Sequence, residues 1–125
     1  MSLELAAGWQ IDLDRGPDWL FVRLTAPVGH DPQAPLAGAL WQLLEQEFTY
    51  RLVLELDDIP LLDSHLLGEL VRLSRRIYSH GGMFRICGLS DRNLQVLQMS
   101  RLAGQVCHYQ TREDAVMGHR PSKPK

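Results

Sequence analysis

The chain has 125 residues, which is the size of one domain with an ordinary hydrophobic core. Its 45% apolar and 22% charged residues are typical of a soluble globular protein, and its net charge of −2 gives no support to nucleic-acid binding. The sequence contains no apolar run of about 20 residues and no signal-peptide pattern at its start. We therefore expect a cytoplasmic protein without a membrane span.

The first half of the chain opens with strand patterns and continues with a helical one. Apolar and polar residues alternate over 9–14, and β-branched and aromatic residues dominate 19–24, so these two segments predict a hairpin. Prolines and glycines over 27–35 predict a loop. Leucines at helical spacing over 36–48 then predict a helix, and we expect Trp41 at the edge of its apolar face to pack against the core.

The centre of the chain predicts a strand, a short loop and a long helix. Apolar residues over 52–56 are almost continuous, as in a strand that is covered on both faces. An amphipathic pattern begins directly after Asp63-Ser64, with Glu69 on its solvated side, and a Gly-Gly pair ends it. This part of the sequence therefore places a serine at the beginning of a helix.

The last third of the chain alternates in the same way. It predicts a strand at 83–87 and a helix that is capped by Ser90 and has Met99 on its apolar face. A short strand at 107–109 and a helix capped by Thr111 follow.

Strands that alternate with helices after a first hairpin predict an α/β fold. We expect a mixed β-sheet with an N-terminal hairpin and about four helices packed on it. This domain should span residues 1–117, and residues 118–125 should form a flexible basic tail, because they carry two prolines and three cations without apolar residues.

Ser64 is the residue with the clearest chemical potential. At a helix beginning, its hydroxyl lies where backbone N–H groups are free and the helix dipole favours negative charge. Such a serine can cap the helix, attack a substrate or be phosphorylated, and spacing alone favours the cap, held by Ser64 or shared with Asp63. Attack on a substrate is disfavoured because Asp63 and His65 are sequence neighbours, whose side chains diverge by about 100° each on a helix. A G-x-S-x-G motif is also absent from the sequence, so we expect no enzyme.

Histidine and cysteine positions give no indication of a metal or cofactor. The five histidines form no H-x-H, H-x-x-x-H or H-E-x-x-H motif, and Cys87 and Cys107 have no C-x-x-C spacing. Cys87 lies in an apolar strand, where we expect it to be a small core residue. We therefore predict that the chain binds no metal.

Four segments in order carry a resemblance to a known family. Residues 54–68 read LELDDIPLLDSHLLG, and residues 81–90 read GGMFRICGLS. Residues 96–102 and 109–116 supply a closing helix, strand and helix pattern. Together they resemble STAS domains, the fold of bacterial anti-sigma factor antagonists, over roughly residues 9–117.

The resemblance implies a regulatory binding module that is switched at Ser64. In the family, a serine kinase that also holds a sigma factor phosphorylates the corresponding serine. The unphosphorylated domain binds this anti-sigma kinase and frees the sigma factor, phosphorylation ends the binding, and a phosphatase restores it. The kinase supplies the ATP site, so the resemblance implies that this domain needs no cofactor. The alternative is a non-switching STAS interaction subunit, such as a stress-signalling scaffold or an accessory subunit of a transport complex, and the oligomeric state is left open.

The resemblance also indicates the surface that a partner would contact. By their position around the serine, the expected contact residues are Asp57, Asp58, Asp63, His65 and Leu66. Two of these depart from the family pattern: His65 replaces a second serine, and Leu66 replaces a glycine. Leucine in place of glycine either fills the core or crowds the approach of the partner.

Overall fold

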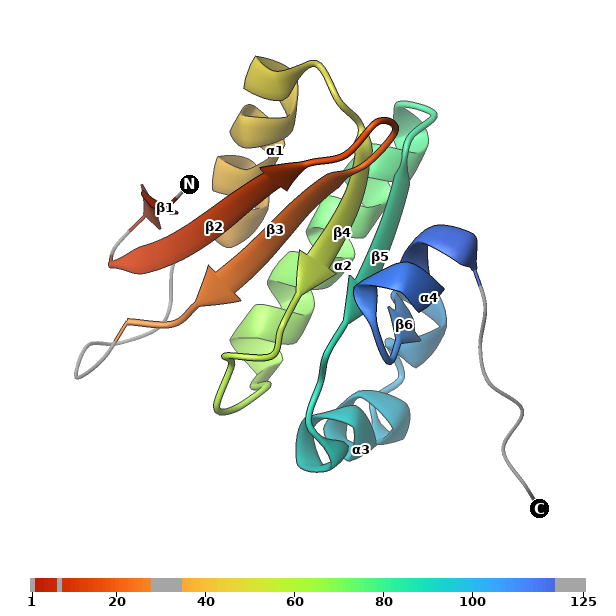
Figure 1. The fold of residues 1–125 in the computed structure, drawn as a ribbon. Coiled ribbons are helices and arrows are strands. Elements are labelled where there is room, and N and C mark those ends of the chain that lie inside the picture. The colour runs from red at the N-terminus through yellow and green to blue at the C-terminus, as the bar shows by residue number, and fades with distance from the viewer. Residues whose placement is uncertain (1, 7, 28–34, 119–125) are drawn as a thin grey trace.

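The computed structural model describes residues 2–6, 8–27 and 35–118. These residues form one six-stranded sheet, four α-helices and a short 3-10 helix (Figure 1). In chain order the elements are β1 (Ser2–Ala6), β2 (Trp9–Arg15), β3 (Leu20–Thr25), α1 (Leu36–Glu47), β4 (Arg51–Glu55), α2 (Ser64–Ser79), β5 (Met83–Cys87), α3 (Asp91–Met99), η1 (Ala103–Gln105), β6 (Cys107–Tyr109) and α4 (Arg112–Met117). The predicted α/β fold is confirmed.

The sheet is mixed, with its strands in the order of the sequence, β1-β2-β3-β4-β5-β6. The predicted hairpin is present: β2 and β3 are antiparallel and pair Ile11 with Leu24. The pairs β3/β4, β4/β5 and β5/β6 are parallel and are connected through helices. Because the carboxyl ends of parallel strands lie at one edge of the sheet, the loops after β4 and β5 lie there together.

The first strand was not predicted. β1 pairs antiparallel with β2, with Leu3 opposite Ile11, and its register shifts between Glu4 and Ala6. It is a short edge strand, and Leu3 remains 39% exposed. Five residues with alternating apolar and polar side chains are a weak signal for a strand. Most of the stabilisation of such a strand comes from its pairing with β2.

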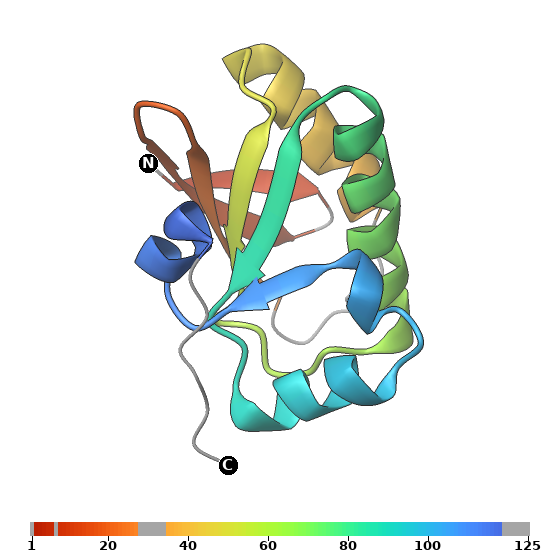
Figure 2. The same ribbon diagram turned by 90° about the vertical axis from the view of Figure 1, so that its right-hand side faces the viewer.

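Helices cover the two faces of the sheet unequally (Figure 2). The helices α1 and α2 pack against each other on one face, over the large apolar core. The helix α4 lies on the other face, where it contacts β4, β5 and β6. A smaller cluster beneath it contains Trp19, Val53, Cys87, Tyr109 and Ala115. The buried position of Cys87 agrees with its prediction as a core residue.

Several local predictions can be compared with the structure. The predicted caps are present: Ser90 accepts a hydrogen bond from the backbone N–H of Asn93, and Thr111 accepts one from that of Asp114. Trp41 is 2% exposed, as the packing prediction requires.

Two burial predictions were wrong. Met99 is 80% exposed because α3 ends there. Glu69 is only 4% exposed, because its carboxylate accepts a hydrogen bond from the backbone N–H of Ala37 and pairs with Arg72. The helix α1 therefore begins against α2, through a contact that the pattern of one helix cannot reveal. Gly118 ends α4 in the left-handed region, so it belongs to the folded domain, and residues 119–125 of the predicted tail lie outside the described residues.

Candidate functional site

The helix α2 is capped by Asp63 and not by Ser64. The backbone of Asp63 is extended, and its Oδ1 accepts a hydrogen bond of 2.8 Å from the backbone N–H of Leu66. Ser64 is the first helical residue and its side chain is exposed. Within the described ranges, no hydrogen bond involves the Ser64 hydroxyl. Of the two residues that the sequence offers as the cap, Asp63 therefore provides it, and the Ser64 hydroxyl is available for other contacts.

The first turn of α2 provides a favourable place for negative charge near Ser64. The first helix-type hydrogen bond runs from the backbone N–H of Leu67 to the carbonyl oxygen of Asp63, at 3.0 Å. Ser64 thus lies at the positive end of the dipole of a 16-residue helix. Asp63 is itself an anion at this end, which adds to the stability of the cap.

The loop between β4 and α2 is held by ion pairs at its beginning. Asp57 and Asp58 have side chains that are 44% and 46% exposed, and both contact the guanidinium group of Arg23, at 3.9 and 3.8 Å. Arg23 also contacts Glu55, whose side chain is 7% exposed, at 3.8 Å. The two loop carboxylates that the sequence predicted are therefore neutralised in part by a strand residue that it did not single out.

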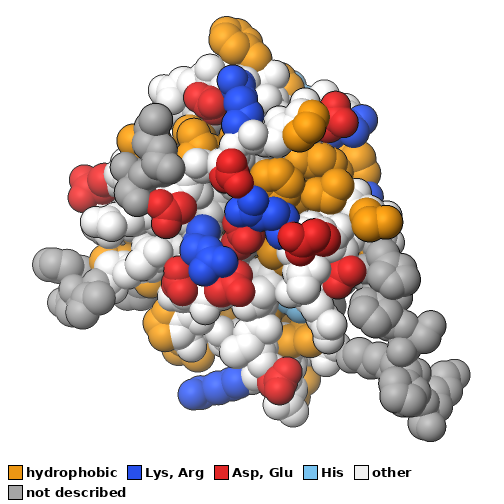
Figure 3. Space-filling view, in the orientation of Figure 1, with side chains coloured by type: hydrophobic (Ala, Val, Ile, Leu, Met, Phe, Trp, Pro, Cys, Tyr) orange, Lys and Arg blue, Asp and Glu red, His pale blue; other side chains and the backbone are white. Residues whose placement is uncertain are grey.

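Arg112 extends this network to the last helix. It donates a hydrogen bond of 2.8 Å to Glu55 and one of 2.7 Å to Asp14. The hydrogen bond to Glu55 is the largest of the causes that raise the pKa of Arg112. The acidic and basic side chains gather near the centre of the face shown in Figure 3. The network thus links α4, β2, β3 and the loop that leads to Ser64.

A buried asparagine holds the second half of the same loop. The side chain of Asn93 donates a hydrogen bond of 3.1 Å to the carbonyl oxygen of Ile59 and accepts one of 3.0 Å from the backbone N–H of Leu62. Asn93 is 0% exposed. Gly88 lies against the loop so closely that an added Cβ would be 2.2 Å from Oδ1 of Asp57, and its φ of +80° also favours glycine. Contacts from α3 and from the end of β5 therefore fix the loop before Ser64.

The two residues that depart from the family pattern have different surroundings. His65 is half-buried, whereas Leu66 is 3% exposed and belongs to the large core. Of the two alternatives for Leu66, the structure selects filling of the core. This side chain also lines an apolar pocket beside the beginning of α2.

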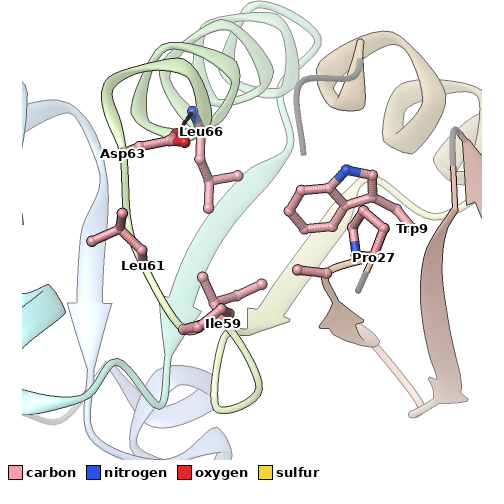
Figure 4. A pocket seen from close by; sticks show the side chains of 8 residues that line it. Trp9, Pro27, Ile59, Leu61, Asp63 and Leu66 are labelled. Carbon is pink, nitrogen blue, oxygen red and sulfur yellow. Dashed lines mark hydrogen bonds between the residues drawn. The ribbon is translucent and has the colours of Figure 1, made fainter. Parts of the chain in front are cut away.

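A mostly apolar pocket of about 130 Å³ lies directly beside the beginning of α2. Figure 4 shows side chains from three separate segments around it. They include Trp9 at the beginning of β2, Pro27 after β3, Ile59 and Leu61 from the loop, and Asp63 and Leu66 at the beginning of α2. Sequence reasoning missed this pocket because only the fold brings these segments together.

The described residues give no indication of a reactive Cys87 thiol or of a metal site. Burial, followed by the charges of Glu55 and Asp57, raises the pKa of Cys87 to about 12, so its thiol stays protonated at neutral pH. Within residues 2–6, 8–27 and 35–118, no three His, Cys, Asp or Glu side chains are grouped as a metal site requires. In the same ranges, no helix has the length and apolar character needed to cross a membrane.

Comparison with known proteins identifies a family. The sequence model of the STAS domain matches residues 10–115 of this chain. The structure of TM1081 from Thermotoga maritima aligns with a TM-score of 0.72 at 19% identity, covering 86% of this chain and 92% of that one.

Two further solved structures align at similar levels. An anti-sigma factor antagonist from Mycobacterium paratuberculosis has a TM-score of 0.68 at 17% identity, covering 93% of this chain and 97% of that one. The phosphorylated form of the Bacillus cell fate determinant SpoIIAA has a TM-score of 0.60 at 16% identity, covering 86% of this chain and 97% of that one. At these identities the likeness to the three structures is one of fold.

Proposed function

We propose that this chain, which belongs to the STAS domain family, is a regulatory binding module of the anti-sigma factor antagonist kind. In its unphosphorylated form it binds an anti-sigma serine kinase in the cytoplasm. The kinase then phosphorylates Ser64, the complex separates, and a phosphatase restores the first state. ATP comes with the kinase, so the chain needs no cofactor of its own. The observation that carries the proposal is the exposed hydroxyl of Ser64, which Asp63 frees from capping.

The position of Ser64 suits a switch that leaves the fold intact. A phosphate adds about −1.5 to −2 charges and three acceptor oxygens. At the first residue of α2 the helix dipole favours this charge, so the domain can carry it without unfolding. A partner that covers a neutral hydroxyl would instead have to remove water from a dianion beside the carboxylate of Asp63. Removing water from such charges costs several kcal/mol, so partner binding is lost.

The contact surface proposed for the partner is centred on the loop before α2. It contains Asp57, Asp58, Asp63, His65 and Leu66. Asp57 and Asp58 are exposed, Asp63 and His65 are half-buried, and Leu66 is buried. Binding is favoured over catalysis because Asp63 is engaged as the helix cap and so is not placed as a base for Ser64. A general base must lie within hydrogen-bond reach of the proton that it removes.

Phosphorylation can be tested directly by mass spectrometry. The purified chain is incubated with ATP and candidate anti-sigma serine kinases from the same genome, and its intact mass is measured. We expect the wild type to gain one phosphate and Ser64→Ala to gain none. Ser90→Ala is the matched control, because Ser90 also lies at the beginning of a helix but caps it, and this variant should still be phosphorylated. A phosphate that remains on Ser64→Ala would refute the assigned site.

The effect on binding needs a second measurement. Ser64→Asp places one negative charge at the first turn of α2, and we expect it to weaken kinase binding at least tenfold while the far-ultraviolet circular dichroism stays unchanged. An unchanged affinity would contradict the proposed switch.

The alternative, a non-switching interaction subunit of the same fold, is favoured by one observation. Leu66 fills the core where the family has a glycine, so the first turn of α2 departs from the family pattern close to the serine. Under this alternative the chain retains its partner but gains no phosphate with any candidate kinase, and Ser64→Asp leaves the affinity unchanged. The two experiments above therefore separate the two functions.

A further inference from the structure

The apolar pocket between Trp9 and Leu66 has no assigned role in the proposed switch. We infer that it receives one leucine-sized side chain of the protein partner, on a segment that carries a cation next to that side chain. The inference rests on the proposed function, because it names the part of the contact surface that supplies apolar affinity. It also specifies the chemistry of the partner segment.

The size of the pocket fits one side chain. Its volume is about 130 Å³. An apolar cavity of about 150 Å³ holds one benzene molecule, so this pocket has room for a side chain of that order and not for a long acyl chain. Trp9, Ile59 and Leu66 are 2%, 5% and 3% exposed and form stable walls, whereas Leu61 is 51% exposed beside the opening. Figure 4 shows the side chains of Trp9, Ile59 and Leu66 around this space.

The charge around the pocket favours a cationic partner segment. Asp63 lines the pocket, and the loop that forms one wall also carries Asp57 and Asp58. Asp63 is the charged residue among those that line the pocket, because the ion-pair network around Arg23 and Arg112 lies on the face of the sheet that α4 covers. An anionic ligand, such as a fatty acid, would meet repulsion there, whereas a lysine or arginine beside the inserted side chain would be attracted.

The pocket lies beside the first turn of α2, which carries Ser64. Asp63 and Leu66, which line it, are one and two residues away from Ser64 on the chain. The partner segment that supplies the inserted side chain therefore lies beside the helix beginning that presents Ser64.

The proposal can be tested with capped tripeptides as probes. Acetyl-Arg-Leu-Arg-amide is titrated into the ¹⁵N-labelled, unphosphorylated chain, and the NMR signals of the Leu61 and Leu66 amides and the Trp9 indole are followed. We expect saturable shifts in the millimolar range. Acetyl-Arg-Ala-Arg-amide should bind roughly tenfold more weakly because it buries less apolar surface. Acetyl-Glu-Leu-Glu-amide should also bind more weakly, because it reverses the charge.

Two variants make the test specific to the pocket. Ala26→Leu fills the pocket from the end of β3 and should abolish the shifts. Leu61→Ser changes an exposed wall residue, so it should keep the fold and weaken binding several-fold even if Ala26→Leu fails to fold. Met99→Ser is the matched control, because Met99 is also an exposed apolar residue but lies on α3, and it should leave the titration unchanged.

Three results would overturn the inference. These are equal affinity for the leucine and alanine peptides, no saturable shift with the leucine peptide, or full binding by Leu61→Ser. The titration uses neither kinase nor phosphate, so it can fail while Ser64 is phosphorylated normally. Conversely, the leucine peptide could bind although no kinase phosphorylates the chain. That result would support the role of the pocket and refute the phosphorylation switch.

Discussion

The loop that presents Ser64 depends on one buried side chain, so Asn93→Ala should destabilise the domain markedly. Asn93 satisfies the carbonyl oxygen of Ile59 and the backbone N–H of Leu62, with distances of 3.1 and 3.0 Å. Alanine can replace neither contact. Both backbone groups would then lack their hydrogen-bond partner, which lies on α3, 31 to 34 residues later in the sequence.

The size of the effect follows from these two groups. Leaving one buried donor or acceptor unsatisfied costs about 1–3 kcal/mol. Two such groups give roughly 2–6 kcal/mol, and we expect about 3 kcal/mol because the loop is close enough to the surface for water to reach one of them. Pro60 and Leu61, between the two contacts, are exposed. For a domain of this size, about 3 kcal/mol lowers Tm by roughly 10 °C.

Equilibrium unfolding in urea measures this prediction. The free energy of unfolding of Asn93→Ala is compared with that of Gln95→Ala, which removes an exposed amide from the same helix and should change stability by less than about 0.5 kcal/mol. Hydrogen exchange should show faster exchange of the Leu62 amide in Asn93→Ala. A loss below about 1 kcal/mol would refute the reasoning, because a buried amide that holds the loop cannot be removed so cheaply.

Three further predictions concern residues around the same site. Asp63→Ala should lower the free energy of unfolding by about 1 kcal/mol through loss of the helix cap, while Ser64→Ala should change it by only a few tenths of a kcal/mol. If urea unfolding showed a larger loss of stability in Ser64→Ala than in Asp63→Ala, the assignment of the cap would be refuted. Arg112→Gln should destabilise by about 2–3 kcal/mol because Glu55, 7% exposed, keeps only the longer contact with Arg23. The exposed control Arg101→Gln should be close to neutral, and equal losses would refute a special role for Arg112. The raised pKa of Cys87 means that the thiol ionises first in the unfolded chain, so stability should fall as pH rises from about 9 towards 12. Urea unfolding at several pH values should show a smaller decline in Cys87→Ala, and identical slopes would contradict the assigned burial effect.

Much of the fold could be predicted because local patterns agree with the tertiary structure. The hairpin, the central parallel strands and the caps at Ser90 and Thr111 each have a signal within a few residues. The first strand lacks such a signal, because its five residues acquire their conformation from pairing with β2. Glu69 shows the same limit for a helix: its burial depends on the beginning of α1, which lies 32 residues earlier in the chain.

The candidate site was predictable in position but not in detail. Asp63 and Ser64 are both good caps, and only the backbone of the structure decides that the helix begins after Asp63. Arg23 contacts the loop acids Asp57 and Asp58 from β3, and Arg112 pairs with Glu55, which lies 57 residues earlier in the chain. The pocket combines the beginning of β2, the end of β3 and the beginning of α2. Such contacts depend on how the strands and helices are connected in space, which the hydrophobic periodicity of the sequence does not specify.

The assignment of the cap to Asp63 changes what the serine can do. If Ser64 were the cap, a phosphate would remove a hydrogen bond that α2 needs, and switching would also weaken the helix. Because Asp63 makes this hydrogen bond to Leu66, modification of Ser64 leaves the cap in place. In the proposed switch, stability and recognition are thus carried by the adjacent residues Asp63 and Ser64. A charge at Ser64 can therefore act on the partner while Asp63 and Asn93 hold the loop in the same conformation.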